Sequence, residues 1–109
     1  MKKLLTVPEE ILLTAIWRLD DDAYGVTIRK KISEVTQREI AYGTLYNILA
    51  QLHRKGYVVK SRSAPTSQRG GRSKIYYRLT PKGIISLQES RELHQKIWVN
   101  LPELVISGN

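Results

Sequence analysis

The hydrophobic pattern of this chain changes its period at Gly56. Over residues 7–55, apolar side chains recur every three or four positions, which is the spacing of one face of an α-helix. Two short runs rich in β-branched and aromatic residues follow, at 57–62 (YVVKSR) and 74–79 (KIYYRL), and such runs are typical of β-strands. The segment between them contains a proline and a Gly-Gly pair, so the sequence predicts a β-hairpin with a long loop at its tip.

The helical part divides into three segments. Thr6-Val7-Pro8-Glu9 has the form of a helix start with a capping box, and the first helix is expected to end at the aspartates of residues 20–22. Asp22 can cap a second helix, which we expect from Ala23 to Thr36. A third helix is expected from Tyr42 to about Lys55, with Gly56 at its C-terminal cap.

A last helix is expected to begin at Thr80-Pro81 and to continue to about Leu101, just before Pro102. The order helix, helix, helix, hairpin, helix predicts a mainly α fold with a small β-hairpin (α+β). We therefore expect a winged helix-turn-helix DNA-binding domain over residues 1–80, followed by a C-terminal dimerisation helix and tail over residues 81–109. In the last helix, one set of residues recurs at alternating intervals of three and four, as along the contact line of a coiled coil: Ile84, Leu87, Arg91, His94, Trp98 and Leu101. Arg91 and His94 suit such a contact line poorly.

The charge of the chain is concentrated in one region. The formal net charge is +8, and no acidic residue occurs between Glu39 and Glu89. A charge of this sign and distribution indicates a polyanionic partner, either nucleic acid or an anionic membrane surface. The membrane alternative is weaker, because the basic residues fall on the hairpin as well as a helix without a matching lipid-facing apolar side.

Several classes of protein are disfavoured by what the sequence lacks. There is no cysteine, and His53 and His94 lie far apart, so we expect no metal and no cofactor. No nucleophile with a base at plausible spacing is present, so we do not expect an enzyme. No apolar run reaches membrane-spanning length and the N-terminal residues lack a signal-peptide core, so we expect a soluble cytoplasmic protein that does not engage a membrane.

The polar face of the third helix has the composition of a helix that enters the DNA major groove. Gly43 and Ala50 allow close approach, while Asn47 and Gln51 can pair with adenine edges. Arginines in the glycine-containing loop can follow a phosphate ridge or enter the minor groove. The predicted DNA-binding residues are Tyr46, Asn47, Gln51, Arg54, Arg69, Arg72 and Lys74.

Other interpretations of the same residues stay open at this point. The polar face of the third helix can be the solvated side of an amphipathic helix, and the loop can be a disordered hairpin tip kept soluble by its charges. A winged-helix module that binds an acidic protein partner, without specific DNA readout, is the main alternative function.

Short motifs strengthen the DNA-binding interpretation. Gly43-Thr44-Leu45-Tyr46 precedes the basic loop, and Gly70-Gly71-Arg72 leads into Tyr76-Tyr77-Arg78-Leu79-Thr80-Pro81-Lys82-Gly83. With Tyr24-Gly25 at the start of the second helix, these motifs resemble the PadR family of bacterial transcriptional regulators, and the length resembles its short subgroup with a single C-terminal helix.

The resemblance implies properties that the spacing of residues does not show. Such proteins are homodimers paired through the helix after the wing, and they usually repress transcription at inverted-repeat operators. Some release DNA when an aromatic or cationic small molecule binds at or near the dimer interface. The residues expected at the dimer interface, and as candidates for contact with a small aromatic effector, are Trp17, His94, Trp98 and Leu101.

Overall fold

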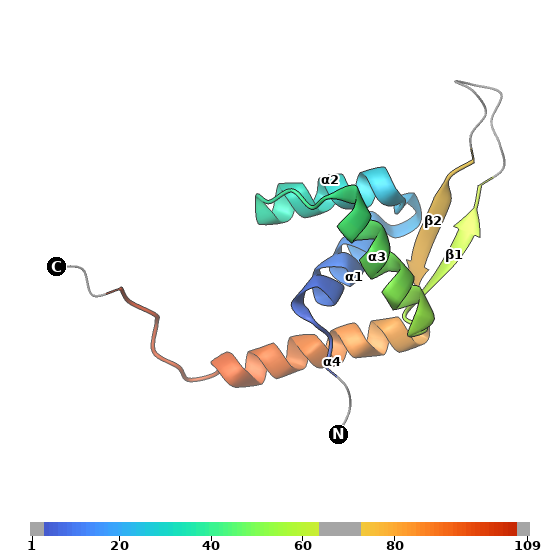
Figure 1. The fold of residues 1–109 in the computed structure, drawn as a ribbon. Coiled ribbons are helices and arrows are strands. Elements are labelled where there is room, and N and C mark those ends of the chain that lie inside the picture. The colour runs from blue at the N-terminus through green and yellow to red at the C-terminus, as the bar shows by residue number, and fades with distance from the viewer. Residues whose placement is uncertain (1–3, 64–72, 107–109) are drawn as a thin grey trace.

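The computed structural model describes residues 4–63 and 73–106, and it has the predicted order of elements (Figure 1). Four helices and a two-stranded antiparallel hairpin form the α+β fold that the sequence predicts. The elements are α1 (Val7–Leu19), a short 3₁₀ turn (Asp20–Asp22), α2 (Gly25–Thr36), α3 (Tyr42–Arg54), β1 (Val58–Arg62), β2 (Ile75–Leu79) and α4 (Pro81–Trp98).

The helix starts at both ends of the chain follow the capping rules that the sequence suggests. The Thr6 hydroxyl accepts a hydrogen bond from the Glu9 amide at 3.2 Å, and the Glu9 carboxylate accepts one from the Thr6 amide at 2.8 Å. At the start of α4, the Thr80 hydroxyl accepts a hydrogen bond from the Gly83 amide. Gly56 follows α3 with φ 79°, a left-handed conformation that favours glycine and turns the chain into the hairpin.

The start of α2 differs from the prediction. The helix begins at Gly25 rather than Ala23, and its N-cap is Tyr24 rather than Asp22. Ala23 accepts a hydrogen bond from the Tyr77 amide at 2.8 Å, and Tyr24 forms an isolated antiparallel bridge with Tyr76. This pairing with β2 holds the two residues in an extended conformation, so the helix cannot begin until the next residue.

The end of α4 is also earlier than predicted, at Trp98 rather than Leu101. Val99, directly after the helix, is extended with φ −66° and ψ 135°, and Asn100 then has a positive φ of 59°, so the helical path breaks before Pro102 is reached. The tail over residues 101–106 has no regular secondary structure.

One core joins α1, α2, α3 and the hairpin. The largest fully buried apolar side chains come from all three helices and from β1: Leu12, Leu13, Ile16, Ile28, Leu45, Leu49, Leu52 and Val58. Tyr77 and Leu79 of β2 are also buried, and Ile84 and Leu87 of α4 pack against the same core. The first half of α4 therefore packs on the body of the protein.

Two parts of the chain project from this body (Figure 1). The hairpin extends to one side, and α4 runs along the base of the helices until its far end and the tail lie clear of them. The radius of gyration is 16.8 Å, whereas a compact chain of this length has roughly 13 Å, so the protein is extended. Among the described helices, none is both long and apolar enough to cross a membrane.

Candidate nucleic-acid interface

Helix α3 presents an exposed polar stripe opposite its buried leucines. Asn47, Ala50 and Arg54 are exposed, whereas Leu45, Leu49 and Leu52 are fully buried. The stripe is shallow, because Ala50 is small and Gly43, near the start of the helix, has no side chain. These positions allow close approach of a large partner to the backbone of α3.

Aromatic and cationic side chains hold the first turns of α3 against α2. The rings of Tyr42 and Tyr46 stack with centroids 6.3 Å apart, and the Arg29 guanidinium lies 4.6 Å from the Tyr42 centroid. Arg29 also donates a hydrogen bond to the Ile40 carbonyl at 2.7 Å, which fixes the connection between the two helices. The Tyr46 hydroxyl lies directly against Gly25, where a Cβ atom would overlap it. A side chain at residue 25 would therefore have to displace the Tyr46 ring.

Gln51 does not lie on the exposed stripe. Its side chain is half-buried, and its amide nitrogen donates a hydrogen bond to Oε2 of Glu9 in α1 at 2.8 Å. Lys55, one turn further along, forms an ion pair with the same oxygen at 2.5 Å. The sequence interpretation recognised Glu9 only as part of the capping box, because it could not place α1 beside the end of α3.

The hairpin carries exposed basic residues on the face that is turned toward α3. In the register of the sheet, Lys60 pairs with Tyr77 and Arg62 pairs with Ile75, so these four side chains share one face. Val58 and Tyr77 on this face are buried in the same core as the leucines of α3, which places the face beside α3. Burial, and secondarily the nearby Tyr46, raises the pKa of Tyr77 above its ordinary value. Lys60 and Arg62 lie in the predicted strand 57–62 and in the basic stretch, but they were not among the predicted DNA-binding residues. Their alternation with Val59 and Ser61 is the signal that could have placed them together on one face of the strand.

Lys74 lies at the base of the predicted loop, at the α2 side of the hairpin. Its ammonium group is 4.4 Å from the centroid of the Tyr24 ring and 3.4 Å from the Tyr24 hydroxyl. The Tyr24 ring in turn contacts the Tyr76 ring edge-on, with centroids 5.4 Å apart. Arg69 and Arg72, the two predicted wing arginines, lie outside the described residues.

The four residues predicted for the dimer interface fall in two places. Trp17 of α1 and His94 of α4 line a hollow of about 510 Å³ between these helices, and Nε2 of His94 lies 3.1 Å from a Glu10 carboxylate oxygen. Trp98 and Leu101 lie beyond this hollow, at the end of α4 and just after it, and more than half of each side chain is exposed.

A three-helix core with an adjoining antiparallel hairpin and an exposed third helix defines a winged-helix protein. The chain matches the model of the transcriptional regulator PadR-like family over residues 12–89 and belongs to that family. It is a transcription regulator and not an enzyme.

Solved structures agree with this assignment. A PadR family transcription regulator from Clostridium difficile is 27% identical, with 82% of this chain and 88% of that chain covered, at a TM-score of 0.63. RosR from H. salinarum is 26% identical, with 90% and 81% covered, at a TM-score of 0.69. F93 from STIV, a winged-helix DNA-binding protein, is 19% identical, with 92% and 100% covered, at a TM-score of 0.69, and shows the fold alone. A search of the curated proteins found no match.

Proposed function

We propose that this chain is a sequence-specific DNA-binding protein that acts as a homodimer and represses transcription at an inverted-repeat operator. The observation that carries the proposal is the position of the exposed stripe of α3 beside the basic face of the hairpin, within a stretch of 49 residues that contains no acid. A stripe of this shape suits the major groove, and the flanking cations suit the phosphate backbone.

In this proposal, the exposed side chains of α3 contact different parts of the DNA. Asn47 and Arg54 contact base edges, because an amide matches adenine and a guanidinium matches guanine. Tyr46 contacts a phosphate at the edge of the helix. Lys60 and Arg62, together with Lys74, Arg69 and Arg72 from the sequence prediction, supply phosphate contacts that depend on salt. Gln51 orients α3 rather than contacting a base, since its amide nitrogen already binds Glu9.

The homodimer is supported by apolar surface that the single chain leaves exposed. Trp17 is 58% exposed beside the hollow between α1 and α4, and Trp98 is 55% exposed at the end of α4, beyond that hollow. Pairing of α4 with its symmetry mate would cover this surface. A twofold axis presents the two α3 helices to DNA in opposite directions, and an inverted repeat has the same symmetry.

The proposal also includes a small aromatic effector that releases the protein from DNA. The hollow beside Trp17 and His94 offers an indole plane and an imidazole ring to a planar molecule. Such a molecule releases DNA only if it binds the DNA-free form more tightly than the DNA-bound form. Titration with a panel of planar aromatic compounds should quench tryptophan fluorescence and weaken DNA binding together, and Trp17→Phe and Trp98→Phe variants should show which indole responds. Quenching with unchanged DNA affinity would contradict a role in release.

The DNA-binding proposal itself is tested by selection from a pool of random duplexes. The protein should enrich a duplex with two related half-sites in inverted order, and a gel-shift titration should show tighter binding to it than to unselected duplex. Equal affinity for both duplexes would favour the alternative of a winged-helix protein-interaction module. Repression is tested by placing the selected site over a promoter that drives a reporter.

A further inference from the structure

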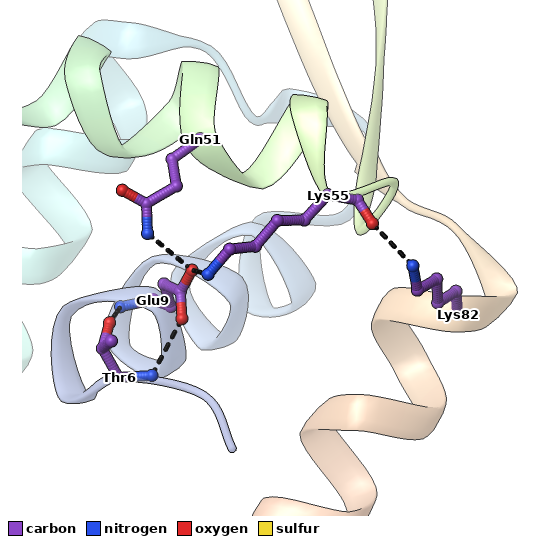
Figure 2. A network of polar contacts seen from close by, with 5 residues as sticks. All are labelled: Thr6, Glu9, Gln51, Lys55 and Lys82. Carbon is purple, nitrogen blue, oxygen red and sulfur yellow. Dashed lines mark hydrogen bonds and ion pairs between the residues drawn. The ribbon is translucent and has the colours of Figure 1, made fainter. Parts of the chain in front are cut away.

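A buried carboxylate connects α1 to the C-terminal end of α3 (Figure 2). Glu9 is 1% exposed, and both of its oxygens are used. Oε1 accepts the hydrogen bond from the Thr6 amide, while Oε2 accepts from Gln51 and from Lys55. Within the described residues, no buried polar side-chain atom lacks a hydrogen-bond partner.

Helix α4 reaches the same end of α3 from the other side (Figure 2). The Lys82 ammonium donates a hydrogen bond to the Lys55 carbonyl at 2.8 Å, and the Thr80 hydroxyl donates one to the Gly56 carbonyl at 2.6 Å. These carbonyls at the end of a helix need partners, and cations are favoured there by the helix dipole. We refer to Thr6, Glu9, Gln51, Lys55 and Lys82 as the Glu9 network.

Two contacts of the network, from Gln51 and Lys55 to Glu9, act on α3 along one side of the helix. Gln51 and Lys55 are four residues apart, so their side chains lie about one turn apart on the same side of the helix. That side is about a quarter turn from the stripe of Asn47, Ala50 and Arg54, at roughly 100° per residue. Two directional contacts along one side oppose rotation of the helix, whereas apolar contacts of the leucines on the core side tolerate small rotations.

Stability alone does not explain a carboxylate at this position. Removing a carboxylate and an ammonium from water costs a large solvation free energy. Well-packed apolar residues of similar volume often give equal or greater stability. Buried polar groups are retained in some proteins because they select a single arrangement of the packed elements. The orientation of α3 is what the contacts of Glu9 select here.

We propose that Glu9 is a positioning residue for DNA readout, which holds the exposed stripe of α3 in the orientation that distinguishes one DNA sequence from another. The proposal rests on the DNA-binding function proposed above. Glu9 touches no DNA in this arrangement and acts through Gln51 and Lys55.

The test compares two substitutions with the same change of charge. Glu9→Gln removes the buried charge and keeps a side chain that can serve the capping box. Glu34→Gln is the control, because Glu34 is an exposed residue of α2 that pairs with Lys31 at 3.3 Å. Affinity is measured for a duplex selected by the wild type and for unselected duplex, at a temperature where circular dichroism shows each variant fully folded.

The two variants should differ in the ratio of the two affinities. Glu34→Gln should keep the wild-type ratio, and any change in affinity should be a gain, because an acid has been removed from a protein that binds a polyanion. Glu9→Gln should lose at least tenfold in the ratio, mainly through weaker binding of the selected duplex. An unchanged ratio for folded Glu9→Gln, or an equal loss in Glu34→Gln, would overturn the proposal.

A second variant separates positioning from stability. Glu9→Gln/Lys55→Met leaves no unpaired ammonium, so its stability should recover relative to Glu9→Gln. The ratio should stay low if Glu9 orients α3, and it should recover with stability if the role is only structural. Loss of a phosphate contact by Lys55 would lower both affinities together and leave the ratio unchanged.

If the wild type itself does not distinguish the two duplexes, the DNA-binding proposal fails, and the position of α3 is then read by nuclear magnetic resonance. The backbone amide resonances of residues 47–55 should shift in Glu9→Gln and not in Glu34→Gln. Unmoved resonances in Glu9→Gln would overturn the positioning role.

Discussion

At the scale of single residues, the most unusual group is the Glu9 carboxylate. Burial on its own would raise the pKa of Glu9, but hydrogen bonds from Lys55, the Thr6 amide and Gln51, together with the charge of Lys55, outweigh burial. The pKa of Glu9 is lowered from 4.5 to about 2. A difference of this size corresponds to about 3 kcal/mol between the two protonation states.

The lowered pKa predicts how stability depends on pH. Between pH 4.5 and about 2 the unfolded chain binds a proton at Glu9 and the folded chain does not, so the free energy of unfolding should fall as pH falls through this window. The contribution should be fully present above pH 4.5 and absent below about 2. Urea unfolding at a series of pH values should show that Glu9→Gln loses ~3 kcal/mol less than the wild type over this window. Parallel pH profiles would contradict the strength of the Lys55 contact.

Two glycines, each in the first turn of a helix, should respond in opposite ways to alanine. Gly25 lies against the Tyr46 hydroxyl, so a methyl group there must displace the tyrosine, and Gly25→Ala should lower the free energy of unfolding by ~1–2 kcal/mol. Gly43 has open space around the position of a Cβ, so Gly43→Ala should raise stability by up to ~1 kcal/mol through helix propensity. Thermal unfolding of both variants measures the two signs, and a stabilised Gly25→Ala would show that Tyr46 moves freely.

At the scale of elements, α3 and the hairpin face the same partner but differ in what they offer. Helix α3 presents an amide and a guanidinium on a shallow stripe, whereas the described strands present lysine and arginine on a face beside it. Hydrogen-bonding groups in a groove read sequence, while cations on phosphates supply affinity.

Replacement of one residue in each element should separate these roles. Asn47→Ala should cost ~1–3 kcal/mol on the selected duplex and relax the preference at one operator position. Arg62→Ala should weaken selected and unselected duplexes alike and reduce the slope of log affinity against log salt by about one. Arg72→Ala should behave like Arg62→Ala. A change of preference in Arg62→Ala, together with an unchanged preference in Asn47→Ala, would reverse the assignment.

At the scale of the whole molecule, the end of α4 leaves large apolar side chains exposed to solvent in the single chain. More than half of each of six apolar side chains is exposed here: Ile97, Trp98, Leu101, Leu104, Val105 and Ile106. This part of the chain lies clear of the helical body (Figure 1). Exposed apolar side chains gathered on one segment are typical of an interaction site.

Association should therefore depend on the end of α4. The wild type should sediment as a dimer at micromolar concentration, and Trp98→Ala/Leu101→Ala should weaken the dimer markedly because both side chains would be buried by a partner. Leu104→Ala is a matched control in the tail, and it should have a smaller effect if the helix itself forms the interface. A monomeric wild type would contradict the dimer.

The sequence alone was sufficient for the order of elements, the capping of α1 and α4, and the exposed stripe of α3. These features depend on local rules: hydrophobic period, cap chemistry and the conformational preferences of proline and glycine. Family motifs at residues 43–46 and 76–83 further identified the class of regulator, which the family match over residues 12–89 confirmed.

The tertiary structure decided where local rules gave way to contacts between distant segments. Pairing of Ala23 and Tyr24 with β2 delayed the start of α2, against the local preference for a cap at Asp22. Glu9 and Gln51 are 42 positions apart in the sequence, and only the packing of α1 against α3 brings the carboxylate to the amide. A side chain at the edge of a helix can point toward solvent or toward a neighbouring element. Which of the two it does depends on partners from distant parts of the chain, and the hydrophobic period of the sequence does not reveal those partners.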